Sequence, residues 1–404
     1  MKKIALLGAF DRFNYGDLLF PIIIEKSLKK SNSIKSNYQI EFYGLKESDL
    51  SEYGAKKTQS IKKLFQKDNL PEKSSLIIVG GEVLGSGWDT MLSHFGSEYG
   101  NFIMKILRKI FGKNNINNLS RRVLNGKTKL PWIIGEDDFG SNINVIYNTV
   151  GGTGFNYLDE SYKKEIIKKI NNSSFFSVRE EKTKNHMVDV LDSRNDIFMS
   201  PDSAIVMSQY FSTNFLESKL SNNVRTFINE CQDYVAFQSG LKYSKGNEKI
   251  ISNQLEKIHK KTGLNVLLIP IGRAGGHSDH IGMKRIKDNI NIPVEIPENC
   301  NIYDIMYLIA KSELFMGTSL HGNITAISFG VPNIGLDKRV SKLDSFLKTW
   351  DIIDGKGTID FKDIFNRFEI VYNYNKKELE SKKKELITLA NNNFDKISNI
   401  IIDS

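Results

Sequence analysis

Short apolar runs alternate with amphipathic stretches along most of the chain. The runs KIALLG (3–8), SLIIVGG (75–81) and NVLLIPIG (265–272) are apolar almost throughout, which is typical of strands buried on both faces. Between such runs, stretches such as 17–30 and 247–263 repeat apolar residues at the spacing of a helix. This alternation of strand and helix predicts an α/β fold, in which helices cover both faces of parallel sheets.

The chain is long for a single domain. Its 404 residues exceed the roughly 250–300 at which one core stops growing. Between Ser212 and Gln232 the pattern turns polar, and a fresh alternation of strands and helices follows. We therefore predict a first domain over 1–215, a second over 216–373, and a charged C-terminal helix over 374–404 that packs back on the first domain.

The net charge of +9 corresponds to a pI of about 9.1. Lysine-rich helical stretches carry much of the excess, as at 25–30, 162–170 and 375–387. Such stretches are either solvated helix faces or surfaces that attract an anionic substrate or membrane. The basic runs lack interleaved aromatic residues, and no nucleic-acid-binding motif is present, so we expect no nucleic-acid partner.

The two cysteines, Cys231 and Cys300, are far apart in the sequence and suggest neither a disulfide framework nor a zinc site. This usage fits a reducing cytoplasm. The first apolar run is short and is followed at once by polar residues, so it indicates a buried strand rather than a signal peptide. No apolar run approaches the roughly 18 residues of a membrane span. We therefore expect a cytoplasmic protein that can associate peripherally with the inner face of a membrane.

The loops that follow predicted strands are the first places to search for a site, because ligands bind beyond the carboxyl ends of strands in open α/β sheets. The loop 8–17 holds Asn14, Gly16 and Asp17. It forms either a backbone nest that faces an anion or a sugar, or a plain strand-to-helix turn in which Asp17 caps the helix.

Two glycine-rich turns follow other predicted strands. Gly80 and Gly81 precede Glu82, and a second turn spans 148–156. Glycine lets a backbone or a ligand approach closely. Neither turn matches the G-x-G-x-x-G pattern, so the sequence does not support a dinucleotide site.

Two charged residues follow later strands of the first half. Arg179 comes directly after the run FFSV (175–178). There its guanidinium either holds a carboxylate or phosphate of a ligand or forms a salt bridge with a nearby carboxylate. Asp202 lies in a predicted turn that begins a helix, and we expect it at the same edge of the sheet as Arg179.

The loop after the predicted strand at 314–317 combines several reactive groups. Thr318, Ser319 and His321 stand there, just before an apolar helix. Hydroxyls, helix-start amides and an imidazole suit an anion whose leaving oxygen must be protonated, or an acid–base step near neutral pH. A purely structural role for this histidine is the alternative.

The loop 269–280 combines Arg273, His277, Asp279 and His280. Arg273 is a candidate anion ligand. The two histidines and the aspartate could bind a metal ion, but their spacing differs from H-E-x-x-H. We therefore expect this loop to contact substrate or solvent, and we expect no metal site.

Five motifs, in their order and spacing, resemble those of the polysaccharide pyruvyl transferase family. They are GAFDRFNYGD (8–17), IIVGGEVLG (77–85), FFSVREEKT (175–183), SPDSAI (200–205) and GTSLHGNITAISFGVPNIGLDKR (317–339). The resemblance extends from about residue 4 to about residue 345. It is strongest in the second half, where a strand, Gly-Thr-x-x-His, a helix, Gly-x-Pro and a strand follow one another.

The resemblance implies a fold like that of GT-B glycosyltransferases, with two Rossmann-like domains facing each other across a cleft. It implies transfer of pyruvate from phosphoenolpyruvate to a sugar, usually as a ketal that bridges two hydroxyls, with no cofactor. The acceptor would be a glycan or a lipid-linked oligosaccharide of a bacterial-type surface polysaccharide. Arg179 and His321 are implied to contact phosphoenolpyruvate.

One position departs from the family pattern. Many members carry arginine two residues before the histidine, where this chain has Ser319. Serine cannot supply that charge, so Arg273, Lys338 or Arg339 would have to supply it. Otherwise the donor differs or activity is lost.

The motifs and the resemblance together give a set of expected roles. His321 is the expected general acid, and Asp17 or Glu82 would orient or deprotonate the acceptor. The expected donor-binding residues are Arg179, Arg273, Thr318, Ser319, Gly322, Lys338 and Arg339, and the expected acceptor-binding residues are Asn14, Gly16, Gly81 and Glu82. The alternatives are a nucleotide-sugar-dependent glycosyltransferase on the same architecture and a non-catalytic sugar-binding member of a polysaccharide assembly system.

Overall fold

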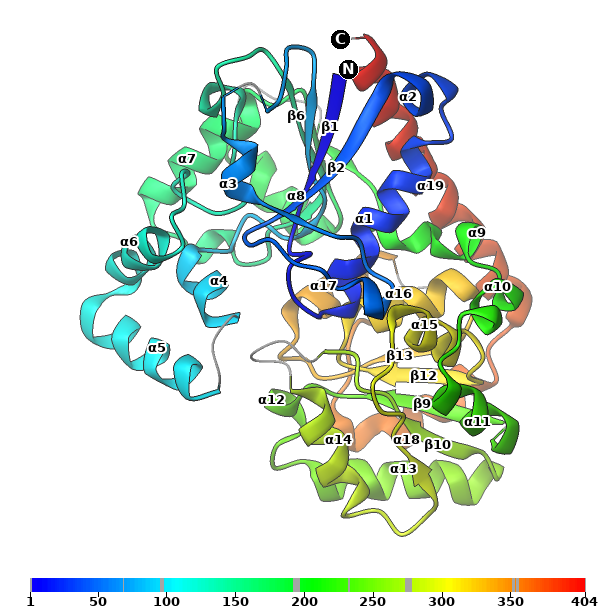
Figure 1. The fold of residues 1–404 in the computed structure, drawn as a ribbon. Coiled ribbons are helices and arrows are strands. Elements are labelled where there is room, and N and C mark those ends of the chain that lie inside the picture. The colour runs from blue at the N-terminus through cyan, green and yellow to red at the C-terminus, as the bar shows by residue number, and fades with distance from the viewer. Residues whose placement is uncertain are drawn as a thin grey trace.

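The computed structural model describes residues 2–67, 69–94, 98–191, 197–231, 233–272, 278–350, 353 and 356–403. It contains two separate sheets, in which every strand pairing is parallel. Figure 1 shows one sheet in each of two lobes, with helices packed around both. The predicted α/β class is confirmed.

The first sheet has the strand order β3-β2-β1-β4-β6-β7-β8, and β5 pairs with β6 off this path. Its strands are β1 (Lys2–Leu7), β2 (Tyr38–Gly44), β3 (Gln59–Ser60), β4 (Ser75–Ile78), β5 (Gly81–Glu82), β6 (Asn144–Gly151), β7 (Phe175–Val178) and β8 (Phe198–Met199). The helices of this part of the chain are α1 (Tyr15–Leu28), α2 (Asn32–Asn37), α3 (Ile61–Leu64), α4 (Trp88–His94), α5 (Glu98–Phe111), α6 (Lys113–Val123), α7 (Glu160–Asn171) and α8 (Glu181–Val188).

The second sheet has the order β11-β10-β9-β12-β13, which is the 3-2-1-4-5 order of a Rossmann-like half. Its strands are β9 (Tyr234–Gln238), β10 (Asn265–Leu268), β11 (Val294–Glu295), β12 (Leu314–Gly317) and β13 (Asn333–Gly335). The helices here are α12 (Leu241–Ser244), α13 (Glu248–Thr262), α14 (Asp279–Lys287), α15 (Ile302–Ala310), α16 (Leu320–Phe329), α17 (Ser341–Trp350) and α18 (Ile364–Tyr372).

Burial on both faces explains why the strand sequences are continuous apolar runs. All residues of β4, β9 and β12 are buried, because helices cover each sheet on two sides. The helices are amphipathic instead. In α13, for example, Ile251, Leu255 and Ile258 are buried at helical spacing, and the helix ends at Gly263, whose φ of 75° suits a left-handed cap.

Three short helices join the two sheets, and a long one closes the chain. They are α9 (Met207–Tyr210), α10 (Thr213–Ser218), α11 (Asn222–Glu230) and α19 (Lys376–Asp403). The first sheet ends at Met199 and the second begins at Tyr234. Helix α10 packs against α15 of the second half. The boundary near residue 215 stays a prediction.

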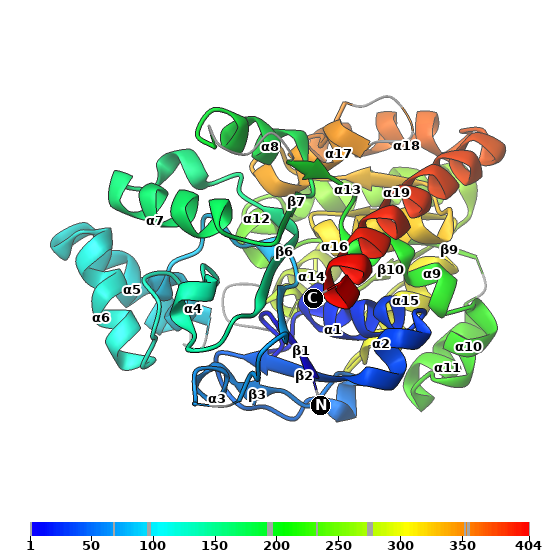
Figure 2. The same ribbon diagram turned by 90° about the horizontal axis from the view of Figure 1, so that it is seen from above.

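Helix α19 contacts α1, α2, β6, β7 and α16. Figures 1 and 2 show it in red, running from the second lobe back along the first. Polar bonds fix it there: Asn393 donates to the side chain of Asn148 at 2.7 Å, and the carbonyl of Ile401 accepts from the Tyr38 hydroxyl at 2.6 Å. Among the described residues, no helix combines the length and apolar character that a bilayer span requires.

One apolar core extends through both halves of the molecule. It joins β1 and α1 of the first half to α15 and α16 of the second, and it includes residues 204–207 and α19. Hydrogen bonds cross the same boundary: Tyr15 and Thr325 share one at 2.9 Å between their hydroxyls, and Ser208 N–H donates to Ser328 Oγ at 3.1 Å. A large apolar contact of this kind restrains movement of the two halves relative to each other.

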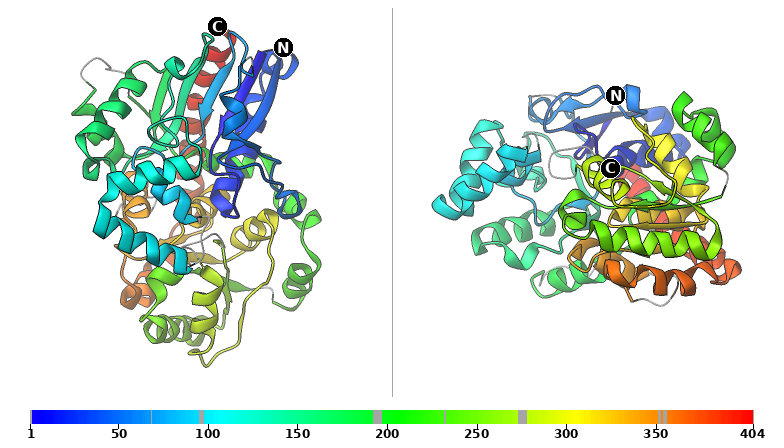
Figure 3. Two further views of the ribbon diagram at one scale, coloured as in Figure 1. Left: turned by 60° about the vertical axis from the view of Figure 1, so that its left-hand side comes forward. Right: turned by 90° about the horizontal axis from the view of Figure 1, so that it is seen from below.

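In both sheets the strand order reverses between the first strand and its later neighbour, that is, between β1 and β4 and between β9 and β12. Ligands of open α/β sheets bind at such reversals, beyond the carboxyl ends of the strands. The loops after these four strands supply residues to one cavity. Figure 3 shows the two lobes, between which this cavity lies, from two further sides. The fold therefore predicts a ligand site at this junction of the two lobes.

Candidate active site

A cavity of about 370 Å³ lies at the junction, which is within the usual size range of small-molecule sites. Residues of both halves form its wall, from the loops after β1, β4, β9, β10 and β12 and from α17. Eight of the site residues predicted from the sequence line this cavity: Asn14, Asp17, Gly81, Glu82, Arg179, Thr318, Ser319 and His321. The structure thus brings most of the candidates to one place.

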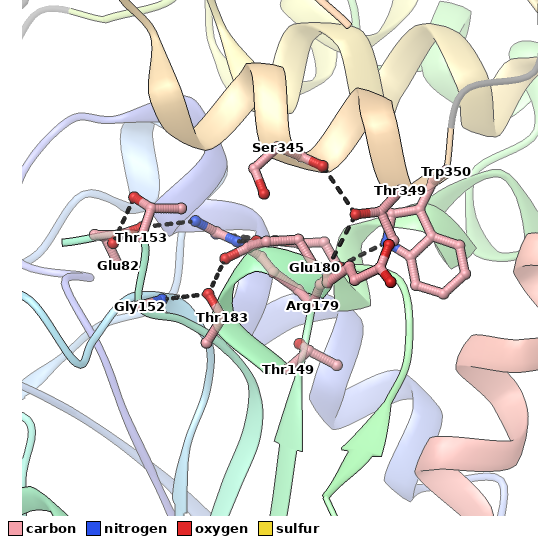
Figure 4. Close-up of polar contacts among 12 residues, drawn as sticks. Glu82, Thr149, Gly152, Thr153, Arg179, Glu180, Thr183, Ser345, Thr349 and Trp350 are labelled. Atoms are coloured by element: carbon pink, nitrogen blue, oxygen red, sulfur yellow. Dashed lines mark hydrogen bonds and ion pairs between the residues drawn. The ribbon is translucent and has the colours of Figure 1, made fainter. Parts of the chain in front are cut away.

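Arg179 is buried among three carboxylates, of which Figure 4 labels Glu82 and Glu180. Its Nε donates to Glu180 at 2.7 Å, its Nη1 to Asp202 at 3.4 Å and its Nη2 to Glu82 at 3.2 Å. Burial by itself lowers the pKa of Arg179, but the carboxylates outweigh it and raise the pKa above its ordinary value. The structure shows salt bridges of Arg179, and its predicted contact with a donor stays a prediction.

The surroundings of Arg179 are shaped to hold it. A Cβ added at Gly151 would lie 2.6 Å from Nη2, so only glycine leaves room for the guanidinium. The carbonyl of Arg179 accepts from Trp350 Nε1 at 2.6 Å, which ties the first half to α17. Burial raises the pKa of Glu180, although Arg179 and a bond from Thr183 act in the opposite direction. The residue is thus fixed in position from several sides.

Glu82 has both carboxylate oxygens engaged. Oε2 faces Arg179, and Oε1 accepts from Thr153 Oγ1 at 3.0 Å and from the Gly154 amide at 3.2 Å. In this arrangement Glu82 is a partner of Arg179. Its predicted contact with an acceptor stays a prediction, as does that of Gly81, which has a φ of 87° and open space where a Cβ would stand.

His321 lies across from Arg179, on the other side of Asp202. Its Nε2 is 3.7 Å from Asp202 Oδ2, the oxygen that also faces Arg179. The imidazole stands edge-on to the ring of Phe20 at 5.2 Å between centroids. Within the described ranges Nε2 has no hydrogen-bond partner. Burial lowers the pKa of His321 to about 4, against the effect of Asp202, and Arg179 and Lys342 lower it further. The resting imidazole is therefore neutral at neutral pH.

Gly16 provides the space for His321 rather than lining the cavity. A Cβ at position 16 would lie 1.8 Å from His321 Nδ1, so any residue other than glycine would clash with the imidazole. The small residue on α1 thus lets a histidine from α16 approach the first half. Gly16 is not among the residues that line the cavity, and its predicted contact with an acceptor stays a prediction.

Helix α16 begins at Leu320, so that His321 lies in its first turn and not in the loop ahead of it. Ser319 is the N-cap, and its Oγ accepts from the Gly322 amide at 3.1 Å. Its own amide donates to Gln238 Oε1 at 2.8 Å, close to Thr318. The Gly322 amide, expected to face an anion, is therefore engaged by the cap, and Gly322 is not among the lining residues.

Helix α1 begins at Tyr15, with Asn14 at the N-cap position and Asp17 in the first turn. The prediction that Asp17 caps this helix is wrong, because the helix starts two residues earlier. Asp17 faces the cavity, where burial raises its pKa to about 6 although Arg12 and Lys342 lower it. The backbone of Asn14 pairs with that of Gly272, which links the halves beside the cavity.

Several other basic candidates lie outside the cavity wall. Lys338 pairs with Asp360 at 3.0 Å. Arg339 pairs with Asp337 and donates to the carbonyl of Tyr243 at 3.0 Å. Neither lines the cavity. Arg273 and His277 fall outside the described residues.

Asp279 belongs to the wall of the second half. Its Oδ2 accepts from Gln238 Nε2 at 2.8 Å and from the amides of Ile271 and Gly272. Burial raises its pKa to about 6, although these bonds lower it. His280, the next residue, is exposed. Asp279 and Gln238 together fix the loops after β9, β10 and β12.

Sequence reasoning missed Lys342, which lies on α17 and lines the cavity. Burial lowers its pKa and Arg179 lowers it further, while Asp17, Glu82 and Asp202 act in the opposite direction. In the part of the chain that the structure describes, no carboxylate oxygen lies within 4 Å of its ammonium. Lys342 is therefore available for an anionic ligand, unlike Arg179. As one lysine in a charged helix, it gave no signal in the sequence.

The residues of the cavity can both bind an anion and transfer protons. Lys342 offers a positive charge, and the neutral imidazole of His321 can accept a proton that Asp202 would then stabilise. Asp17, with its raised pKa, can hold a proton near neutral pH. This set suits a reaction in which hydroxyl groups lose protons and a leaving group gains one.

Comparisons with known proteins identify a family and a fold. The profile of a family described as "Polysaccharide pyruvyl transferase" matches residues 14–337. That range includes Asp17, Arg179 and His321 and ends before Lys342. A search of curated proteins finds no match.

Solved structures resemble this fold over nearly the whole chain. The S. aureus MnaA–UDP structure is 10% identical, covering 99% of this chain and 95% of that one, with a TM-score of 0.53. UDP-N-acetylglucosamine 2-epimerase from Rickettsia bellii is 11% identical, with coverages of 99% and 98% and a TM-score of 0.52. UDP-GlcNAc 2-epimerase from Neisseria meningitidis, bound to UDP-GlcNAc, is 12% identical over all of both chains, with a TM-score of 0.51. The predicted GT-B-like architecture is confirmed.

Proposed function

Because the chain belongs to the polysaccharide pyruvyl transferase family, we propose that it transfers pyruvate from phosphoenolpyruvate to two hydroxyls of a sugar, as a ketal. The sugar belongs to a surface polysaccharide or to its lipid-linked precursor. One observation carries the proposal: Arg179 and His321, from opposite halves, both line one cavity and both face the same oxygen of the buried Asp202. The fixed positive charge of Arg179 thus lies near the imidazole of His321, which can carry protons.

Lys342 is assigned to the phosphate of the donor. Lys342 is partly buried in the wall of the cavity, and no carboxylate of the described residues is in contact with its ammonium. A bound phosphate would supply the missing counter-charge. Arg179 is saturated by Glu82, Glu180 and Asp202. We therefore assign to Arg179 the positioning of Asp202 rather than direct contact with the donor. Lys342 would take the place of the arginine that many family members carry at the position of Ser319.

The protons can be followed through the reaction. Asp17 donates its proton to C3 of the enol, a sugar hydroxyl adds to C2, and His321 takes the proton of that hydroxyl. The bond from C2 to the phosphate oxygen then breaks, and the imidazolium returns its proton to the departing phosphate. A second hydroxyl adds to C2 and restores the proton of Asp17. Because the pKa of His321 is lowered to about 4, its imidazole is unprotonated at rest and free to take up the proton, and the imidazolium then gives the proton up readily.

The test is to combine the protein with phosphoenolpyruvate and a panel of lipid-linked glycans. Phosphate release and a pyruvyl mass increment on the glycan, in equal amounts, are the expected result. A nucleotide-sugar glycosyltransferase would instead be stabilised against heat by UDP or GDP and not by phosphoenolpyruvate. A non-catalytic sugar-binding protein would show no turnover with any acceptor, and either outcome would refute the proposal.

Replacing Lys342 with methionine should raise the KM for phosphoenolpyruvate roughly 10- to 100-fold, because a charge-assisted hydrogen bond is lost. We expect kcat to change much less, since the bond forms in the ground state and the transition state alike. Steady-state kinetics of Lys342→Met and Lys338→Met give the comparison. An equal rise in KM in both variants, or a rise for Lys338→Met alone, would contradict the assignment of Lys342.

A further inference from the structure

The segment 103–127, which we call the α5–α6 arm, exposes an unusual number of apolar side chains. Figures 1 and 2 show α5 and α6 projecting at one side of the first lobe. Half of the large apolar side chains that the structure describes as exposed lie on this arm: Ile103, Ile106, Ile110, Phe111, Leu119 and Val123, which are 42–66% exposed. Isolated exposed apolar residues are normal, but a cluster indicates a binding surface.

The spacing of these residues places them along one side of each helix. Ile103, Ile106 and Ile110 recur at intervals of three and four along α5, and Leu119 and Val123 are four apart on α6. Such intervals form a continuous stripe on a helix. In the described part of the chain, α5 packs mainly on α4 and α6, so its stripe is left facing outward.

The same region carries positive charge without any negative charge. Residues 99–135 contain eight Lys and Arg and no Asp or Glu, in a chain whose net charge is +9. One of the eight, Arg108, pairs with Asp89 of α4 at 2.7 Å. In the basic stretch 162–170, Lys163 pairs with Glu160, and Lys168 and Lys169 pair with Asp137. The charge of the arm is thus concentrated beside its apolar stripe.

The arm is fixed to the wall of the cavity. Helix α4 supplies Met91 to the cavity. Trp88, in the same helix, donates from its amide to Asn117 of α6 at 2.6 Å and from Nε1 to the carbonyl of Thr128 at 3.0 Å. Asn117 in turn donates to the Tyr162 hydroxyl at 2.9 Å. Whatever binds the arm is therefore held close to the cavity.

We propose that the α5–α6 arm binds the surface of a bilayer that contains anionic lipids. An amphipathic helix with an apolar stripe between lysines lies in the interface, its apolar side among the acyl chains and its lysines at the headgroups. The uniformly positive charge of the arm is attracted by the negative potential of such a surface. The same charge disfavours a second copy of this chain as the occupant, because two basic arms would repel each other.

The arm would bring a lipid-linked acceptor to the cavity, and this role rests on the proposed function. Binding to the bilayer itself does not rest on it. Vesicle binding without substrates tests the arm alone, and the phosphate-release assay tests the reaction alone, so that either can fail without the other.

The experiment is co-sedimentation of the full chain with vesicles of equal parts phosphatidylglycerol and phosphatidylcholine, and with vesicles of phosphatidylcholine only. We expect binding to the first kind, weakened by added salt. The double change Lys105→Glu with Lys109→Glu should weaken binding at least about 25-fold, since each basic residue near the surface contributes roughly fivefold. The double change Ile103→Ser with Ile106→Ser should also abolish sedimentation.

Matched controls lie on exposed positions far along the chain. Lys257→Glu with Lys260→Glu makes the same change in net charge on α13, and Ile250→Ser with Ile370→Ser removes two exposed isoleucines elsewhere. Both should bind as the unchanged protein does, and all variants should melt within a few degrees of it. Equal losses in arm and control variants, equal binding to neutral vesicles, or a dimer in light scattering that the arm variants abolish would each overturn the proposal.

Discussion

Replacing Arg179 with methionine is expected to lower the free energy of unfolding by about 3–5 kcal/mol. Methionine fills much of the same space, but it leaves Glu180 and Asp202 buried without the cation that compensates them. Breaking a buried ion pair from one side strands the remaining charge, and this accounts for the size of the effect. Urea denaturation followed by tryptophan fluorescence measures it.

The loss should also depend on pH. Burial already raises the pKa of Glu180 in the folded protein, and removing Arg179 takes away an influence that lowers it. Because the folded state then holds a proton that the unfolded state releases near pH 4, stability falls as pH rises between the unfolded and the folded pKa. We expect the variant to be closest to the unchanged protein at about pH 5 and furthest from it at about pH 8.

Lys63→Met provides the control, since it removes the cation of an ion pair with Glu47 in which both side chains are exposed. Its effect should stay below about 1 kcal/mol, as is usual for surface ion pairs. A loss for Arg179→Met no larger than this, or one independent of pH, would mean that the buried carboxylates do not depend on Arg179.

Replacing His321 with alanine should reduce kcat roughly 10²- to 10⁴-fold, the range that one acid–base group contributes. The imidazole is placed to accept a proton because its resting form is neutral and Asp202 lies 3.7 Å from Nε2. Turnover of phosphoenolpyruvate with a working acceptor measures the loss. A variant that keeps more than about a tenth of the activity would remove His321 from the proposed chemistry.

A second variant tests whether the position of the imidazole matters, and not only its presence. Gly16→Ala keeps the histidine but places a methyl group where the ring now lies, so a similar loss of kcat is expected. Gly140→Ala is the control, because a Cβ at position 140 meets nothing within 4 Å. If Gly16→Ala turned over at the normal rate, the observed position of the His321 imidazole would not be the one used in catalysis.

The strands and the edge that carries the site could be predicted from the sequence. Parallel strands buried on two faces, such as β4 and β9, leave unbroken apolar runs that are easily recognised. Their carboxyl ends share one edge, so polar residues just after them converge even when they are far apart in the chain. This is why Asp17, Arg179 and His321 line the same cavity.

The partners of these residues could not be predicted in the same way. Glu82 and Arg179 are 97 positions apart, and their contact depends on how β5 and β7 are placed on either side of β6. Lys342 resembles any lysine of a charged helix until α17 packs beside the cavity. Helix α1 begins two residues before the predicted start at Asp17, because Asn14 and Asp17 both suit a helix N-terminus.

The charge of residues 99–135 could have been recognised in the sequence, because eight basic residues without an acidic one are visible there. The lysine-rich stretches elsewhere were more conspicuous, although each also contains glutamate. Whether apolar residues such as Ile106 and Ile110 are exposed, however, depends on which elements cover α5. Only the tertiary arrangement decides this.

The apolar core that both halves share limits how the family's parts could be recombined. Helix α16, which carries His321, packs against α1, α19 and residues 203–206 rather than against its own sheet alone. A chimera that took residues 234–372 from a relative with another donor would therefore bring a foreign surface to α1 and α19. Exchanging one half for another would require those packing partners to be exchanged along with it, so the two lobes have to diverge together.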